Sequence, residues 1–170
     1  MQMPSKVMIV FGTRPEAIKM APICLLLKKN KNFDPIICTT SQHVSMLNQV
    51  LDIFSIKPNI NLKIMKKNQD LFDININVLN EMKKCLLKVS PEMVLVHGDT
   101  TTAYATSIAC FYLNIPISHV EAGLRTNNIK MPFPEEFNRQ IDEIKKRFWD
   151  GDLSQWRKSF VSNSDEQSKF

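Results

Sequence analysis

Two acidic residues stand just beyond the ends of apolar runs, in positions where they could transfer protons to and from a substrate. Asp99 follows the run Met93–His97, and Glu121 follows the run Ile115–Val120. If these runs are neighbouring strands, their ends lie ~4.8 Å apart and the two carboxyl groups converge. Crowded carboxyl groups raise the pKa of at least one member, which places a general acid beside a general base. The alternative is that Asp99 only caps the helix that follows it.

Cationic residues accompany a third loop, Gly12–Glu16, which also follows an apolar run. A helix that starts near Pro15 would present free N–H groups and the positive end of its dipole to this loop. Arg14 adds a planar donor fork, and Lys19 lies one turn into the helix. The loop therefore predicts a phosphate or diphosphate site, although it has neither the Walker A nor the GxGxxG pattern. The alternative is that Arg14 is a surface residue paired with Glu16.

Three further residues could take part in chemistry or could be structural. Glu135 follows Pro134, and both fit the first turn of a helix, where the dipole stabilises acidic side chains. His97 borders the expected site at the end of its strand, and both interpretations stay open. His119 lies inside a strand, where a hydrogen-bonded core histidine is the more common case.

The elements that would position these residues alternate along the chain. Short apolar runs predict strands, and apolar residues at helical spacing predict helices between them. This order favours right-handed βαβ units and an α/β fold, with a parallel sheet covered by helices on both faces. Gly12, Gly98 and Gly123 follow strands, at the sheet edge where ligands bind in open α/β folds. The expected strands are 6–11, 35–40, 93–97 and 115–120, with another at 60–64, and the expected helices are 15–31, 43–54, 71–89, 102–113 and 135–148.

Composition excludes several classes of protein. The chain has 170 residues, 44% hydrophobic and 23% charged, which is unlike a disordered tail, a collagen or a coiled coil. Its net charge of +5 comes from scattered bases without a basic face, so we expect no nucleic-acid partner. The longest uncharged stretch, 100–118, is broken by polar residues and proline, so we expect no membrane span.

The ends of the sequence and its cysteines indicate location and domain organisation. The first residues lack a signal-peptide pattern, so we expect a cytoplasmic protein. The four cysteines form no CxxC pair, which favours buried reduced thiols over zinc ligands or disulfides. Residues 1–150 form one expected domain, and 151–170 have no apolar periodicity and are expected to form an irregular tail.

Four motifs carry a resemblance to a known family. FGTRPEAIKMAP (Phe11–Pro22), VLVHGDTTT (Val94–Thr102), HVEAGLRT (His119–Thr126) and PEEFNRQ (Pro134–Gln140) resemble the non-hydrolysing bacterial UDP-N-acetylglucosamine 2-epimerases. Their order and spacing agree with that family over residues 6–140. The resemblance implies the first of two Rossmann-like domains in the glycosyltransferase-B arrangement, with the active site in the cleft between them.

The resemblance also implies an activity. Such enzymes convert UDP-N-acetylglucosamine to UDP-N-acetylmannosamine by eliminating UDP and adding it back, without a metal or nicotinamide cofactor, and supply sugars for cell-surface polysaccharides. By motif, Asp99, Glu121 and Glu135 correspond to the essential acidic residues, and Arg14 and Lys19 to substrate-binding residues on the nucleotide side. Family members dimerise through this domain, which implies a homodimer.

The sequence departs from the family in two places. After Gln140 it no longer resembles the family, so we expect the second nucleotide-binding domain to be missing and the chain to have little activity alone. In the family's regulatory site Gln42 and His43 are kept, but Val44 and Asn68 replace arginines, which argues against allosteric activation. Two alternatives stay open: a non-catalytic remnant that serves as a dimerisation or binding module, and a hydrolysing 2-epimerase.

Overall fold

A parallel sheet of five strands forms the centre of the protein. In the computed structural model, residues 3–40, 44–66, 68–122, 126–128 and 130 are described. The strands lie in the order β3-β2-β1-β4-β5, and every neighbouring pair is parallel. The strands are β1 (Ser5–Phe11), β2 (Phe33–Thr39), β3 (Ile60–Asn61), β4 (Met93–His97) and β5 (Ile117–Val120).

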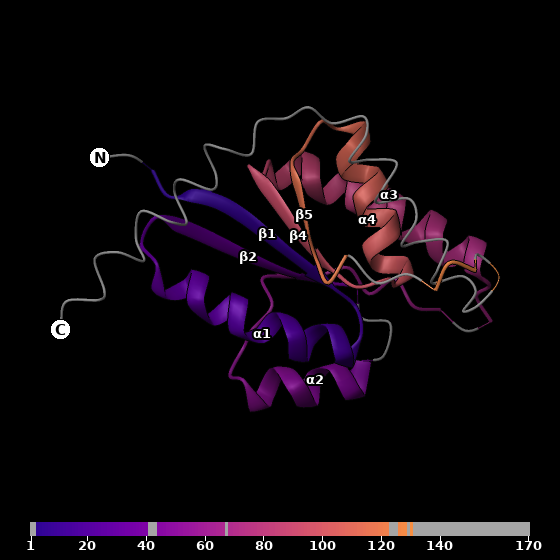
Figure 1. Ribbon diagram of the computed structural model, residues 1–170, viewed down its shortest axis with the longest axis horizontal. Helices are drawn as coiled ribbons and strands as arrows, with labels where there is room; N and C mark the ends of the chain where they lie inside the picture. Colours follow the sequence, from indigo (N-terminus) through magenta and orange to yellow (C-terminus); the bar gives the residue numbers. More distant parts are fainter. Residues whose placement is uncertain (1–2, 41–43, 67, 123–125, 129, 131–170) are drawn as a thin grey trace.

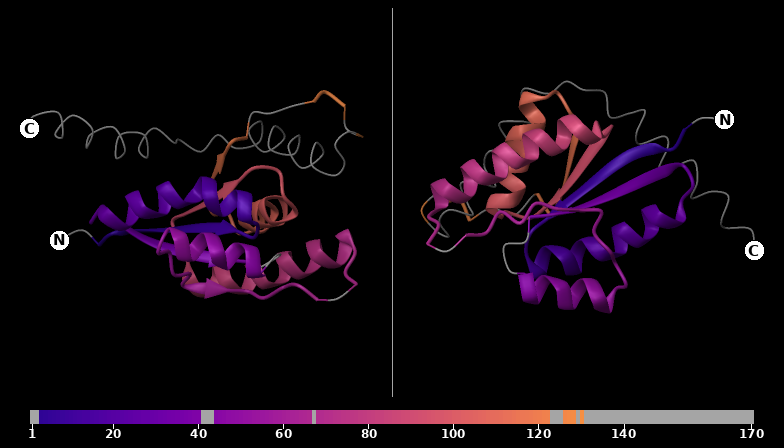
Figure 2. Two further views of the ribbon diagram at one scale, coloured as in Figure 1. Left: turned by 90° about the horizontal axis from the view of Figure 1, so that it is seen from below. Right: turned by 180° about the vertical axis from the view of Figure 1, so that it is seen from behind.

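Four helices connect these strands and cover both faces of the sheet. Figures 1 and 2 show α1 and α2 on one face and α3 and α4 on the other. The predicted α/β fold with helices on both faces is therefore confirmed. The helices are α1 (Arg14–Lys29), α2 (Val44–Ile53), α3 (Leu71–Val89) and α4 (Thr101–Tyr112). The predicted helix 135–148 and the predicted tail 151–170 lie outside the described residues.

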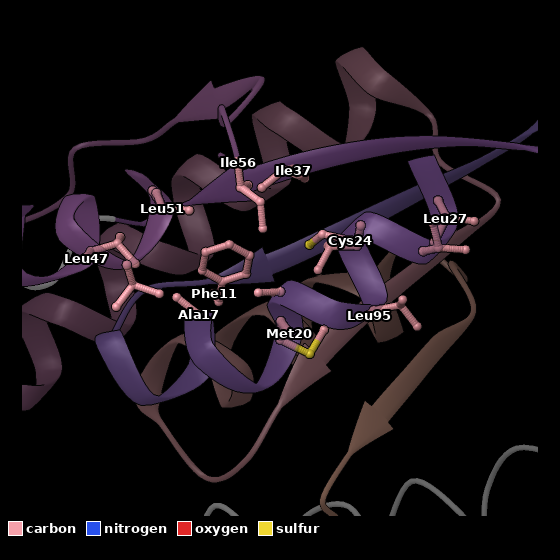
Figure 3. Packing of buried hydrophobic residues seen from close by; sticks show 14 of the residues in the cluster. Phe11, Ala17, Met20, Cys24, Leu27, Ile37, Leu47, Leu51, Ile56 and Leu95 are labelled. Atoms are coloured by element: carbon pink, nitrogen blue, oxygen red, sulfur yellow. The ribbon is translucent and has the colours of Figure 1, made fainter. Parts of the chain in front are cut away.

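Two apolar cores follow from the alternation of side chains along the strands. On β1, Val7, Ile9 and Phe11 pack in the core beneath α1 and α2, whereas Met8 and Val10 pack in the core beneath α3 and α4. Because both faces of a parallel sheet are covered, its strands are apolar at consecutive positions. Figure 3 shows Phe11 among side chains of α1 and α2.

The residues at the ends of α1 and α3 are of types that favour the beginning or the end of a helix. Asp70 caps α3 by accepting a hydrogen bond from the Asp73 N–H, and Ser90 ends this helix in the left-handed conformation with a φ of 48°. Lys28 and Lys29 stand in the last turn of α1, where cations interact favourably with the helix dipole. In the described part of the chain, no helix is both long and apolar enough to cross a membrane.

Candidate active site

The strand order reverses between β1 and β4, and the loops after these two strands carry several of the predicted site residues. β1 is followed by β2 on one side of the sheet, whereas β4 lies on its other side. In open α/β sheets, ligands bind at this position, outside the carboxyl ends of the strands. Arg14 is the first residue of α1, directly after the loop that follows β1, and Asp99 belongs to the loop after β4.

A buried carboxylate joins these two loops. Glu16, only 1% exposed, accepts hydrogen bonds through Oε2 from the N–H groups of Gly12 (2.9 Å) and Thr13 (2.7 Å). Its Oε1 accepts a 2.6 Å hydrogen bond from the Thr100 hydroxyl, which belongs to the loop after β4. A buried charge is tolerated only when hydrogen bonds satisfy it, and here three hydrogen bonds do so.

This carboxylate occupies two backbone donors that precede α1, beside the expected phosphate site. Glu16 takes the Gly12 and Thr13 donors and brings a negative charge to the positive end of the helix dipole. A diphosphate near this loop would therefore contact exposed side chains such as Arg14 rather than those two backbone groups. The alternative expectation was an ion pair between Arg14 and Glu16, and no such pair forms among the described residues.

A second set of contacts joins α1, β4 and the residue after β5. Lys19 Nζ donates a 3.4 Å hydrogen bond to Glu121 Oε1, although the two residues are 102 positions apart in the sequence. His97 Nε2 lies 2.7 Å from Glu121 Oε2, an ion-pair distance without the alignment of a good hydrogen bond. The Glu121 carboxylate thus lies between a lysine and a histidine.

The electrostatic surroundings of Glu121 differ from the expectation of crowded carboxyl groups. The Lys19 cation holds the pKa of Glu121 below its usual value, through its charge and its hydrogen bond, and His97 acts in the same direction. The crowding argument predicted a raised pKa for at least one carboxyl group, and Glu121 is not that group. A carboxylate that stays ionised at neutral pH can accept a proton.

The backbone of Glu121 is also unusual. Its φ of 63° lies in the left-handed region, which side chains other than glycine and asparagine seldom adopt. Such conformations persist where the surrounding structure imposes them, and they cluster at functional sites. This conformation by itself does not mark a site, because six other described residues that are not glycine also have a positive φ, namely Ser55, Lys63, Asn68, Ser90, Asn114 and Asn127.

Asp99 lies in the loop beside Glu121, as the sequence predicted. The register pairs His97 with Val120, and the Gly98 N–H donates a 3.0 Å hydrogen bond to the Val120 carbonyl, so the loops that follow are adjacent. The cap of α4 is Thr100, whose hydroxyl accepts a hydrogen bond from the Ala103 N–H. Thr100 therefore has the capping role that the alternative interpretation gave to Asp99.

The two histidines point to opposite faces of the sheet. His97 is on the α1 side, like Leu95 in the same strand, whereas His119 is paired in register with Val96 on the α4 side. The His119 Nε2 atom contacts the Gly98 carbonyl oxygen. The interpretation of His119 as a hydrogen-bonded structural histidine agrees with this contact.

Several predicted site residues lie outside the described part of the chain. They are Glu135, Gln42 and His43. Asn68 is described, and it is exposed with a φ of 59°. Among the described residues, no three His, Cys, Asp or Glu side chains are grouped as metal ligands would be.

Glu16 is the residue that sequence reasoning missed. Thr13 and Glu16 are spaced as in a capping box, in which the third helical residue reaches back to the cap backbone. That signal could have identified the bond to the Thr13 N–H. The bond to Thr100, 84 residues away, has no local signal.

Comparison with known proteins gives one consistent family. A family model described as UDP-N-acetylglucosamine 2-epimerase matches residues 26–144. UDP-N-acetylglucosamine 2-epimerases of Campylobacter jejuni and Bacillus subtilis are 55% and 56% identical to the chain over 139 and 136 residues, which are 82% and 80% of this chain. The chain spans only 36% of the length of each relative.

Solved structures agree with this result. The crystal structure of UDP-GlcNAc 2-epimerase from Neisseria meningitidis, bound to UDP-GlcNAc, is 51% identical with a TM-score of 0.78. The match covers 82% of this chain and 38% of that one. The similarity therefore concerns one part of a longer architecture.

Proposed function

The chain belongs to the UDP-N-acetylglucosamine 2-epimerase family, and on that premise we propose that it is the amino-terminal domain of a non-hydrolysing 2-epimerase. Its substrate would be UDP-N-acetylglucosamine and its product UDP-N-acetylmannosamine. The observation that supports this best is the Glu121 carboxylate, which lies between Lys19 and His97 beside the loop of Asp99. An ionised carboxylate beside a second acidic residue suits the removal and return of a proton at one carbon.

The reaction would proceed by elimination and re-addition. One carboxylate takes the proton from carbon 2 of the sugar, the electron pair forms the double bond between carbons 1 and 2, and the bond from carbon 1 to UDP breaks. Arg14 and Lys19 would stabilise the negative charge of the departing diphosphate. UDP then adds back to carbon 1, and carbon 2 receives a proton on its other face. We propose Asp99, Glu121 and Glu135 as the groups that move these protons.

The test uses the chain joined to the second domain of the Neisseria meningitidis relative, incubated with UDP-N-acetylglucosamine in deuterated water. We expect UDP-N-acetylmannosamine that carries deuterium at carbon 2. Asp99→Asn, Glu121→Gln and Glu135→Gln should each lower the rate by ~10²–10⁴-fold, the usual contribution of general acid–base catalysis. Asp34→Asn, an exposed acid on β2, is the matched control and should leave the rate unchanged.

Two results would contradict parts of this proposal. Release of UDP and free N-acetylmannosamine would favour the hydrolysing alternative. A folded fusion protein that binds UDP but neither turns over nor exchanges the carbon 2 proton would contradict the catalytic role. The unfused chain should be at least ~10³-fold slower than the fusion protein, because positioning and diphosphate contacts from the second domain are absent.

We also propose a homodimer that forms through α3 and α4, which pack against each other. Apolar side chains are exposed on both helices, namely Phe72 (78%) and Ile76 (56%) on α3, and Phe111 (49%) and Tyr112 (69%) on α4. Analytical ultracentrifugation should find a dimer, and the double variant Phe72→Ser/Ile76→Ser should weaken it. Ile53→Ser on α2, where the side chain is 76% exposed, is the control. Dissociation by the control alone would contradict this assignment.

The remaining part of the proposal concerns location. The described cysteines are all free and buried, which is typical of a reducing compartment. We propose that the protein works in the cytoplasm and supplies an activated sugar for cell-surface polysaccharides. Cell fractionation tests the location.

A further inference from the structure

His97 is a buried polar side chain with fewer polar partners than a buried imidazole normally has. Its side chain is only 8% exposed, and its one close polar contact in the described structure is Glu121 Oε2 at 2.7 Å. The Nδ1 atom has no hydrogen-bond partner among the described residues. A buried imidazole normally has a partner for each nitrogen. His119 is different, because its Nε2 atom contacts the Gly98 carbonyl on the other face of the sheet.

The titratable groups on the elements around His97 are few. Lys19 and Glu16 lie on α1, Asp99 follows β4, and Glu121 follows β5. Glu16 is fully engaged by three other donors, and Lys19 contacts the other oxygen of Glu121. The contact between His97 and Glu121 therefore connects a buried base to one defined oxygen of the carboxylate.

We propose that His97 is a positioning residue for Glu121, and that it accepts from Glu121 the proton which this carboxylate removes from the substrate. The inference rests on the function proposed above. The proton would pass from Glu121 Oε2 to His97 Nε2, which restores the carboxylate and leaves an imidazolium. Over a full cycle the imidazolium releases this proton to solvent, and the acid that protonates the other face regains one from solvent, so protons and charges balance and no oxidant or reductant is needed. The poorly aligned contact found here is typical of unliganded enzymes, in which catalytic hydrogen bonds tighten only with substrate bound.

This transfer would serve epimerisation in particular. A proton kept on Glu121 could return to the same face of carbon 2 and regenerate the starting sugar. A proton moved to His97 is withdrawn from that face, while a different acid protonates the other face. Because Lys19 holds Oε1, the carboxylate keeps its second oxygen directed at His97.

The first test needs no activity and uses the 170-residue chain itself. NMR titration should show that His97→Gln raises the pKa of Glu121, because His97 contributes to holding that pKa below its usual value. His119→Gln, the matched control on the other face, should leave the Glu121 curve unchanged. In the converse variant Glu121→Gln, the chemical shifts of the His97 imidazole at neutral pH should differ from those of the parent chain. A Glu121 curve unchanged by folded His97→Gln, or His97 shifts unchanged by Glu121→Gln, would overturn the proposal.

The second test uses the fusion protein in deuterated water. His97→Gln should lower kcat by at least about tenfold with little change in KM, and should alter the pH profile of kcat. Recovered UDP-N-acetylglucosamine should contain less deuterium, relative to the product, because Glu121 then returns the proton that it removed. A purely structural role for His97 would not move this isotope ratio. An active fusion protein with an unchanged ratio and pH profile would overturn the inference, whereas an inactive parent fusion would contradict the proposed function and leave the decision to the titration.

Discussion

The carboxylate of Glu16 and the hydroxyl of Thr100 form a 2.6 Å hydrogen bond across the position where the strand order reverses. One partner lies in the first turn of α1, and the other caps α4. The bond fixes the start of α1, where Arg14 lies, relative to the loop that carries Asp99. Since both segments follow strands of the same sheet, a small shift of either would change the candidate site.

Replacement of Glu16 should therefore destabilise the fold. Glu16→Ala leaves the Gly12 and Thr13 N–H groups and the Thr100 hydroxyl without their acceptor, and we expect a loss of ~2–4 kcal/mol in the free energy of unfolding. Glu16→Gln keeps one carbonyl acceptor for the two N–H groups and should cost only about 1 kcal/mol. Urea denaturation of the chain measures both values. Equal effects of the two variants would show that the charge, and not the hydrogen bonds, is what matters.

The left-handed backbone at Glu121 predicts that glycine relieves strain at this position. Glu121→Gly and Glu121→Ala lose the same contacts with Lys19 and His97, but glycine adopts a positive φ without strain, so Glu121→Gly should be about 0.5–1 kcal/mol more stable than Glu121→Ala. Ser90→Gly, at a φ of 48° in the end of α3, is the matched control and should likewise be more stable than Ser90→Ala, without affecting catalysis in the fusion protein. Thermal denaturation measures these differences. A Glu121→Gly variant no more stable than Glu121→Ala, beside a stabilised Ser90→Gly variant, would contradict the assignment of strain.

The lowered pKa of Glu121 predicts how its contribution to stability depends on pH. A carboxyl group with a lower pKa in the folded state than in the unfolded chain stabilises the fold above its unfolded pKa, and this contribution is lost as the pH falls through the folded pKa. The difference in stability between the parent chain and Glu121→Gln should thus be constant near neutral pH. It should shrink once the pH falls below the ordinary value of 4.5.

Lys19→Met tests the cause of that effect. Because Lys19 contributes most to the lowered pKa, its removal should flatten the pH dependence of the same difference. The measurement is urea denaturation across the acidic range, with Lys29→Met at the exposed end of α1 as the control. An unchanged pH dependence in Lys19→Met would assign the effect to another group.

Cys24 and Cys38 should be unreactive in the native protein. Burial raises the pKa of the Cys24 thiol to about 11, and the pKa of Cys38 is raised by its hydrogen bond to Cys85 and by burial. Since the thiolate is the reactive form, alkylation of these two thiols at about pH 8 should be at least ~100-fold slower in the native state than in concentrated urea. Mass spectrometry after timed alkylation measures this. Rapid modification of Cys24 or Cys38 in the folded chain would show that its site is open.

The order of strands and helices could be read from the sequence because it depends on local pattern. The apolar run 93–97 and the helical spacing of 71–89 correspond to β4 and α3 with unchanged bounds. Asp99 and Glu121 were expected at the carboxyl ends of neighbouring strands, and the register of β4 and β5 agrees. When a helix connects two parallel strands of one sheet, the connection is almost always right-handed. Few arrangements of the strands and helices were therefore compatible with the sequence.

Only the tertiary structure decided which groups meet at the sheet edge. The sequence led to an expected anion site at the start of α1, and no local pattern indicated that folding links the Glu16 carboxylate there to the Gly12 N–H and to Thr100. It also led to an expected crowding of acids, whereas Glu121 contacts a cation 102 positions earlier in the chain. These contacts depend on the strand order and on which face each side chain takes. Both are set by the packing of distant segments, so neither local propensity nor hydrophobic periodicity could determine them.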